Sequence, residues 1–313
     1  MPYFGEMAAL GTALCWSLTS LFFMESGKRI GAFRVNNIRL IMASLIYCVI
    51  LLIVYGSIWP VEISLSQLSI LALSAFIGLV IGDLAGFKAL VMIGPRLGTL
   101  LWSTAPVMVV VIAWIFLGEQ LHPVQLGGIG MTLAGVAWVV TERQSKNQAD
   151  NSVRLDRKTM MIGIGLGLVA AFGQGAGLVL SKQAMLYSGD QIPAMPASFV
   201  RMLSAMVMSW MITGFRGKIR HTLRAIGDKK AMAFSSGGAF FGPFLGVWLS
   251  MVAIVHIEAG IAATLNAMTP IMILPLVTLF YKEKVSLRAY LGAIVSVGGV
   301  VVLILSDRIV AWF

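Results

Sequence analysis

Charged residues are scarce in this chain of 313 residues, because Asp, Glu, Lys and Arg together make up only 12% of the sequence. A soluble domain is about one quarter charged. Hydrophobic residues reach 58%, and the mean hydropathy is +0.91. The composition therefore excludes an ordinary soluble domain and predicts an integral membrane protein with little mass outside the bilayer.

Cysteine and histidine, which build disulfides and metal sites, are rare as well. Cys15 and Cys48 both lie in apolar runs, and the three histidines show no metal-ligand spacing. The sequence also lacks the phosphate-binding loop of a primary pump and any paired-acid or Ser/His/Asp set of an intramembrane enzyme. We therefore expect no metal, no cofactor and no enzymatic activity.

Long apolar runs are what the chain does have, each close to the ~20 residues that span a bilayer as a helix. The ten predicted spans are residues 6–24, 35–55, 67–91, 95–117, 124–141, 159–181, 195–214, 231–254, 257–281 and 288–306. The most polar stretch, 142–158, separates the fifth from the sixth. We therefore predict an all-α membrane protein with one five-helix unit at 1–145, a linker at 146–158 and a second unit at 159–313.

The second unit repeats the first at a nearly constant shift in numbering. Pro106, Glu119, Gly128 and Gly135 map onto Pro270, Glu283, Gly292 and Gly299 at an offset of 164, while Arg39 pairs with Arg201 at an offset of 162. Two copies of an odd number of spans must face opposite ways across the bilayer. The sequence thus predicts two inverted five-helix repeats, an architecture that many secondary transporters use.

The net charge of +10 does not indicate nucleic acid, because the cations gather in short connections between spans. Nineteen of the 23 Lys and Arg residues follow the first, third, fifth, seventh and ninth spans. Positive residues concentrate on the cytoplasmic side of membrane proteins. We therefore expect the linker in the cytoplasm and both termini outside.

Short motifs recur in order in both repeats. The first repeat has Pro95-Arg96-Leu97-Gly98, Thr104-Ala105-Pro106, Leu117-Gly118-Glu119 and Gly135-Val136; the second has Thr269-Pro270, Lys282-Glu283 and Gly298-Gly299-Val300. This series resembles the EamA-like branch of the drug/metabolite transporter superfamily over about residues 5–306. The resemblance implies a ten-helix transporter of amino acids, other metabolites, drugs or nucleotide sugars.

Asp83 is the only acid well inside a predicted span. A charged group at that depth needs a partner or a water-filled cavity. It is a candidate for proton coupling and for binding a substrate amine; the alternative is an acid that reaches a cytoplasmic cation such as Lys88 or Arg96. Arg39 and Arg201 are candidate contacts for a substrate anion, although arginines near span ends more often extend to the lipid headgroups.

Two prolines fall near the middle of spans four and nine, where they should kink the helix. Pro106 follows Ser103, and Pro270 follows Asn266 and Thr269. Polar groups at a kink are candidate substrate contacts, because irregular backbone at this depth lines cavities. The alternative for Asn266 is a hydrogen bond between helices.

Further mid-membrane candidates are aromatic or amide side chains. Trp16, Trp102, Trp248 and Gln174 lie away from the interfacial belt and are candidate substrate-binding residues; Phe172 is more typical of packing. Glu119 and Glu283 should fix the turn to the next helix at the membrane surface. Gly127, Gly128, Gly135 and the glycines between 163 and 177 should let helices approach closely.

Together these features predict a secondary transporter of small metabolites, and the resemblance implies an exporter in a bacterial cytoplasmic (inner) membrane. Its partners would be a small-molecule substrate, the lipid bilayer and, through Asp83, protons. The alternative function with the same fold is a lipid or lipid-carrier flippase. An intramembrane enzyme fits the sequence least well.

Overall fold

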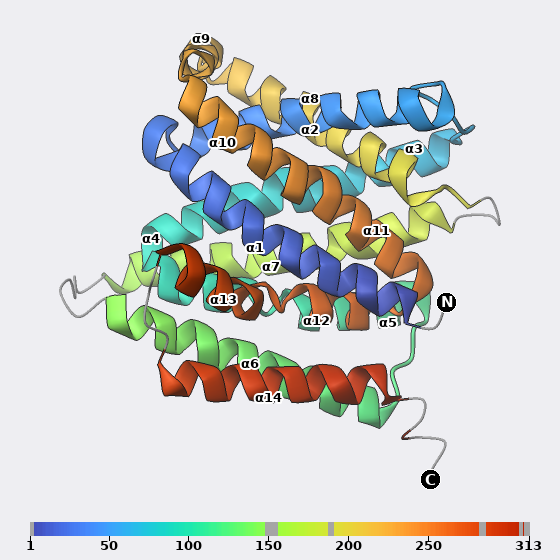
Figure 1. The fold of residues 1–313 in the computed structure, drawn as a ribbon. Coiled ribbons are helices and arrows are strands. Elements are labelled where there is room, and N and C mark those ends of the chain that lie inside the picture. Colours follow the sequence, from blue (N-terminus) through green and yellow to red (C-terminus); the bar gives the residue numbers. More distant parts are fainter. Residues whose placement is uncertain (1–2, 148–155, 187–190, 282–285, 307–308, 310–313) are drawn as a thin grey trace.

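The computed structural model describes residues 3–147, 156–186, 191–281, 286–306 and 309 (Figure 1). These residues form helices and contain no strand, which confirms the all-α fold. Nine helical stretches in the described part are long and apolar enough to cross a membrane, and a shorter apolar helix spans Ala105–Leu117. The helices are α1 (Phe4–Ile30), α2 (Ala32–Tyr55), α3 (Leu65–Ala75), α4 (Asp83–Trp102), α5 (Ala105–Leu117), α6 (Pro123–Asn147), α7 (Arg157–Met185), α8 (Ala194–Phe215), α9 (Ile219–Leu223), α10 (Lys229–Ala239), α11 (Val247–His256), α12 (Ala259–Asn266), α13 (Thr269–Tyr281) and α14 (Leu287–Ile304).

The repeat is visible in the element boundaries themselves. Helices α10 and α13 have the bounds of α3 and α5, shifted by the same offset in numbering that relates the sequence motifs. Two π-helical turns, η1 (Phe76–Gly82) and η4 (Phe240–Gly246), are related in the same way. The two-repeat architecture predicted from the sequence is therefore confirmed.

Even the helix starts correspond. Ser64 accepts a hydrogen bond from the Gln67 N–H at the start of α3. Asp228, at the equivalent position of the second repeat, accepts one from the Ala231 N–H at the start of α10. Ser and Asp are favoured at this position because their side chains satisfy amide groups that have no partner inside the helix.

The prolines do more than kink their helices. Residues 103–104 separate α4 from α5, and residues 267–268 separate α12 from α13, so each helix is interrupted just before its proline. The predicted boundary between spans three and four, at 92–94, instead falls inside α4. The equivalent boundary in the second repeat does exist, between α11 and α12.

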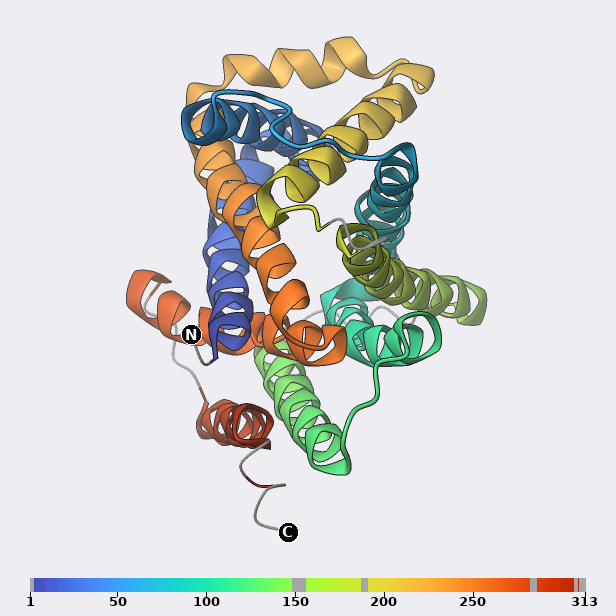
Figure 2. The same ribbon diagram turned by 90° about the vertical axis from the view of Figure 1, so that its right-hand side faces the viewer.

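The first helix of each repeat packs against the other repeat. Helix α1 contacts α10, η4, α11, α12 and α13, whereas α7 contacts α3, η1, α4 and α5. Figure 2 shows the resulting bodies on its two sides, with α1 and α10 on the left and α3 and α7 on the right. We call α1 together with α10, η4, α11, α12 and α13 the α1 body, and α7 together with α3, η1, α4 and α5 the α7 body.

Two pairs of repeat-related helices connect these bodies, one pair at each end of the molecule. Helices α2 and α8 pack together at one end of the molecule, and α6 and α14 at the other (Figure 2). Asn37 holds the first pair, because its side-chain oxygen accepts hydrogen bonds from Ser209 and Thr213. In the second pair a Cβ on Gly135 would lie 2.6 Å from the Gly292 oxygen, and one on Gly128 would lie 3.1 Å from the Gly299 oxygen.

Most of the predicted close approaches by glycine are present. For glycines 163, 167, 173, 175 and 177, an atom of a neighbouring helix lies within 3.1 Å of the place that a Cβ would take. Gly127 and Gly165 are exceptions, because open space surrounds them. The prediction for these two glycines is therefore wrong: they face away from the helix contacts.

The largest buried apolar cluster lies toward the face where α1 begins. It joins Ala8 and Ala9 of α1 with Ala184 and Met185 at the end of α7 and Ile254 near the end of α11. We call this the closed face. The other face, where α1 ends and α10 begins, carries Lys28, Arg29, Lys229 and Lys230 and is called the basic face.

Candidate substrate cavity

A cavity of about 680 Å³ lies between the α1 body and the α7 body. It extends from Gln174 and Asn266 to Met24 and Ala32, at the end of α1 and the start of α2, which belong to the basic face. Eleven of the residues singled out from the sequence line it: Trp16, Arg39, Asp83, Trp102, Ser103, Pro106, Gln174, Arg201, Asn266, Thr269 and Pro270.

Asp83 forms the polar centre of the first repeat's side of the cavity. Its Oδ2 lies 2.5 Å from Arg39 Nη2, and its Oδ1 accepts a 2.9 Å hydrogen bond from Gln174 Nε2. Gln174 also donates to the Gly78 oxygen in the π-helical turn η1, at 3.2 Å. Asp83 is only 6% exposed, so the pairing offsets the cost of a carboxylate at this depth.

These contacts change the interpretation of two charged residues. The acid pairs with Arg39 rather than with Lys88, and the side chain of Arg96 lies outside the described residues. Arg39 does not extend to the headgroups, since it is buried and its guanidinium carbon lies 5.7 Å from the centre of the Phe23 ring.

The break in the second repeat carries its own polar groups. Asn266 Nδ2 donates to Ser250 Oγ at 3.2 Å, and its buried Oδ1 has no hydrogen-bond partner among the described residues. Pro270 cannot donate to the Asn266 backbone oxygen one turn earlier, and Thr269 Oγ1 donates to it instead, at 2.9 Å. Ser17 of α1 donates to the Thr269 oxygen at 3.0 Å, which fixes α1 to the break.

Aromatic side chains form much of the remaining wall. Trp102 packs against Gly86, where a Cβ would lie 2.8 Å from the indole ring, and meets Phe87 edge-on. Trp248 does not line the cavity but packs on the apolar cluster around Tyr47, which corrects the sequence prediction. Phe172 is 52% exposed and does not line it either.

Sequence reasoning missed one polar cavity residue of α2, the helix that carries Arg39. Asn36 lines the cavity, is 8% exposed, and its Oδ1 has no partner among the described residues. It precedes Arg39 by about one helical turn and so shares a helix face with it. That spacing of two polar residues at the start of an apolar span was the available signal.

An ion pair lies at the closed face. Lys182 Nζ of α7 lies 2.7 Å from Glu119 Oε1 at the end of α5 and donates to the Ile257 oxygen, also at 2.7 Å. Glu119 Oε2 accepts a 2.8 Å hydrogen bond from the Ala259 N–H at the start of α12. Glu119 thus has a structural role, but it links α5 to α7 and α12 rather than fixing the turn to α6. Glu283 lies outside the described residues.

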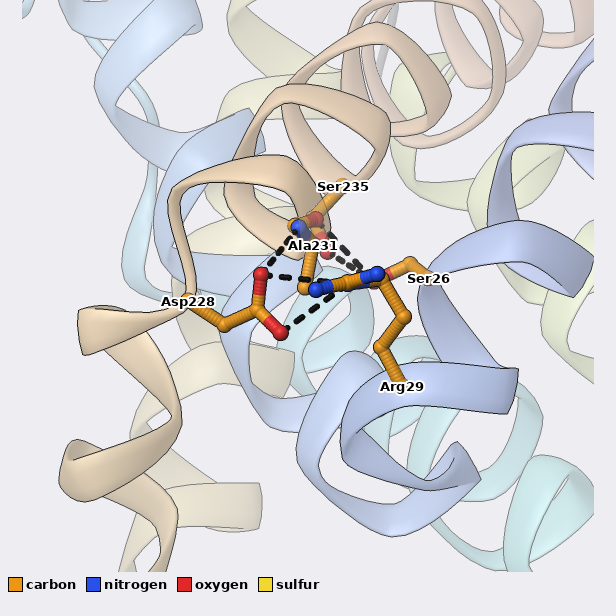
Figure 3. Close-up of polar contacts among 5 residues, drawn as sticks. All are labelled: Ser26, Arg29, Asp228, Ala231 and Ser235. Carbon is orange, nitrogen blue, oxygen red and sulfur yellow. Dashed lines mark hydrogen bonds and ion pairs between the residues drawn. The ribbon is translucent and has the colours of Figure 1, made fainter.

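Polar contacts also join α1 to α10 at the basic face (Figure 3). Arg29 Nε lies 2.9 Å from Asp228 Oδ2, and Ser26 Oγ lies 2.7 Å from Ser235 Oγ. The Ala231 N–H and the Arg29 guanidinium hold the pKa of Asp228 below its usual value. These contacts lie beside the cavity rather than across it, because α1 and α10 belong to the same body.

The cavity contains one carboxylate, two guanidinium groups and several amides, which suit recognition of a small polar molecule. No group of three or more His, Cys, Asp or Glu side chains gathers within the described residues. The polar side chains that line the cavity can bind a small molecule through hydrogen bonds and charge pairing.

Comparisons with known proteins define the class. The EamA-like transporter family matches residues 3–141 and 161–305, so the chain belongs to that family. A protein of Archaeoglobus fulgidus described as an uncharacterized transporter is 23% identical over 300 residues, covering 96% of this chain and 97% of its own. A solved crystal structure has the same fold, with a TM-score of 0.75 at 15% identity, over 95% of this chain and 94% of that one. The protein is a multi-pass membrane transporter.

Proposed function

We propose that the protein is a secondary transporter that moves small metabolites, amino acids or related compounds, through the central cavity by alternating access. The observation that carries this proposal is the cavity itself, which lies at two broken helices related by the repeat and is lined by residues of both bodies. Inverted repeats with a site at discontinuous helices are how many transporters expose one site to each side in turn.

The moving parts in this proposal are the α1 body and the α7 body, rather than the two halves of the sequence. The described conformation is open toward the basic face, and Glu119, Lys182 and the apolar cluster close the other face. Opening that face requires α5 and α7 to separate from α11 and α12, which the Glu119 and Lys182 contacts now join.

The orientation follows from the charge distribution. We place the basic face in the cytoplasm of a bacterium, with both termini outside, because cations concentrate on the cytoplasmic side of membrane proteins. A cavity open to the cytoplasm suits loading of a substrate for export. Protonation of Asp83 would release Arg39 and Gln174, and it is our candidate for coupling transport to protons.

Counterflow in proteoliposomes tests the proposal. Purified protein is loaded with an unlabelled amino acid, cationic dye or nucleoside and offered the labelled compound, with and without a pH gradient. Exchange of one class that exceeds that of empty liposomes supports transport. Folded protein that exchanges none of them but moves a labelled phospholipid between leaflets would contradict the proposal and favour the flippase.

A further inference from the structure

The two cavity arginines occupy equivalent places in the two repeats but have different partners. Arg39 pairs with Asp83. The offset between the repeats maps Asp83 onto Val247, so the second repeat has an aliphatic side chain where the first has the acid. Val247 also lines the cavity. Arg201 therefore lacks the counter-ion that its repeat mate has.

Among the described residues, Asp83 is the acid that acts electrostatically on Arg201, and it is already paired with Arg39. Arg201 is 5% exposed. Its Nη1 donates a 3.6 Å hydrogen bond to the sulfur of Met251, which follows Val247 by one helical turn. Its Nε has no hydrogen-bond partner, and no carboxylate of the described residues lies within ion-pair distance. Thioether sulfur is a weak acceptor. A buried guanidinium without an anion is strongly disfavoured.

The cavity wall as a whole also has an excess of positive charge. The charged side chains that line it are Arg39, Asp83 and Arg201, so the wall carries one net positive charge. Most of the other lining residues are apolar, among them Trp16, Phe23 and Leu79. A ligand that complements this wall has one anionic group and an apolar body.

We propose that Arg201 anchors the carboxylate of the transported compound, and that the substrates are small organic carboxylates with an apolar or aromatic body. The planar guanidinium matches a carboxylate with two parallel hydrogen bonds. This inference rests on the proposed transport function. It separates the arginines: Arg39 belongs to the Asp83 pair, and Arg201 faces the substrate.

Two kinds of variant test the anchor from opposite directions. Arg201→Gln removes the cation, whereas Val247→Asp keeps it and supplies the missing acid one turn from the Met251 contact. Val247→Asn is the matched control, because it has the size and polarity of aspartate without the charge. If Arg201→Gln fails to fold, as judged by gel filtration, the Val247 pair still decides the question.

The probes are four compounds that share one aromatic body: 3-phenylpropionate, phenylalanine, phenylalaninamide and phenethylamine. Binding to the purified full-length protein is measured by calorimetry at pH 7. We expect the two carboxylates to bind at least tenfold more tightly than the amide and the amine. Tighter binding of phenylalanine than of 3-phenylpropionate would identify amino acids as the preferred carboxylates. Arg201→Gln and Val247→Asp should each weaken carboxylate binding at least tenfold, and Val247→Asn should weaken it clearly less than Val247→Asp.

Three results would overturn the anchor: amide or amine that binds as tightly as the carboxylates, no binding of either carboxylate, or carboxylate binding that both charge variants leave unchanged. Counterflow with the same compounds separates this failure from failure of the proposed function. A carboxylate that binds through Arg201 but does not exchange across the membrane contradicts transport and leaves the anchor in place. Exchange of the amine alone contradicts the anchor and supports transport.

Discussion

At the scale of single residues, Asp83 and Arg39 depend on each other. Both are buried and joined at 2.5 Å, so Asp83→Asn leaves an uncompensated cation in the membrane. Breaking a buried ion pair in this way costs about 3–5 kcal/mol. We expect Asp83→Asn to lower the thermal unfolding temperature of the detergent-solubilised protein and to remove the dependence of counterflow on a pH gradient.

A double variant supplies the control for this pair. Asp83→Asn combined with Arg39→Met removes both charges, so its loss of thermal stability should be smaller than that of Asp83→Asn alone. Counterflow that keeps its full rate and its response to pH in Asp83→Asn would show that this carboxylate does not couple transport to protons.

Asp228 allows a prediction about pH outside the membrane. Its pKa is lowered by the Ala231 N–H and by Arg29, so its ionised form stabilises the fold above the pKa of the unfolded chain. That contribution disappears as the pH falls through the lowered pKa of the folded state. The unfolding temperature of Asp228→Asn should therefore lie slightly below that of the unmodified protein at pH 7, and the two should converge in acid, below about pH 4. A gap that is equally large at pH 7 and pH 3 would contradict this role.

At the scale of helices, the contact between α6 and α14 depends on the absence of side-chain atoms. A Cβ on Gly135 would lie 2.5 Å from the Ser296 backbone nitrogen and 2.6 Å from the Gly292 oxygen. Backbone atoms of a packed helix cannot move aside locally, and overpacking costs about 1–3 kcal/mol. We expect Gly135→Ala to lower the free energy of unfolding by about that amount, measured by denaturant titration in detergent.

Gly127→Ala is the control for this contact, because it lies in the same helix and meets nothing within 4 Å. Alanine favours a helix over glycine, so this variant should be neutral or slightly more stable. Equal stability of the two alanine variants would show that α6 and α14 do not require the close approach.

Much of the helix pattern could be predicted from the sequence, because apolar runs long enough to span a bilayer and a constant offset between motifs are both visible in the sequence itself. Most of the cavity could also be predicted, since polar residues such as Asp83 and Asn266 are conspicuous in apolar helices. Trp248 was misplaced because the position along a span does not give the direction of a side chain. The partner of Asp83 was missed because Arg39 lies far from it in the sequence, on another helix, and only packing brings the two together.

At the scale of the whole molecule, α1 packs on helices of the second repeat and α7 on helices of the first. The sequence did not predict this arrangement, because an apolar helix does not reveal which other apolar helix it contacts. The consequence of the arrangement is a specific closure of one face. Glu119 and Lys182 join α5 to α7, and their backbone contacts reach α11 and α12 of the α1 body. The ion pair itself lies within the α7 body, and the hydrogen bonds of Lys182 to the Ile257 oxygen and of the Ala259 N–H to Glu119 join the two bodies on the closed face.

Removing the Lys182 contact with the α1 body should shift the protein toward the conformation open to the other side. Lys182→Met removes the 2.7 Å hydrogen bond to the Ile257 oxygen. A hydrogen bond from a charged donor contributes about 1.5–3 kcal/mol, enough to change a two-state population about tenfold or more. The measurement uses a chain in which Cys15 and Cys48 are replaced by alanine and Ser20→Cys supplies one thiol. A membrane-impermeant thiol reagent then labels this thiol from either side of the membrane. Ser20 lines the cavity, so the reagent should reach it from the basic face. Lys182→Met should increase labelling from the closed face at least tenfold, whereas Lys229→Met, at an exposed position on the basic face, should not. Labelling from the closed face that is the same in both variants would mean that the apolar cluster alone keeps the two bodies together.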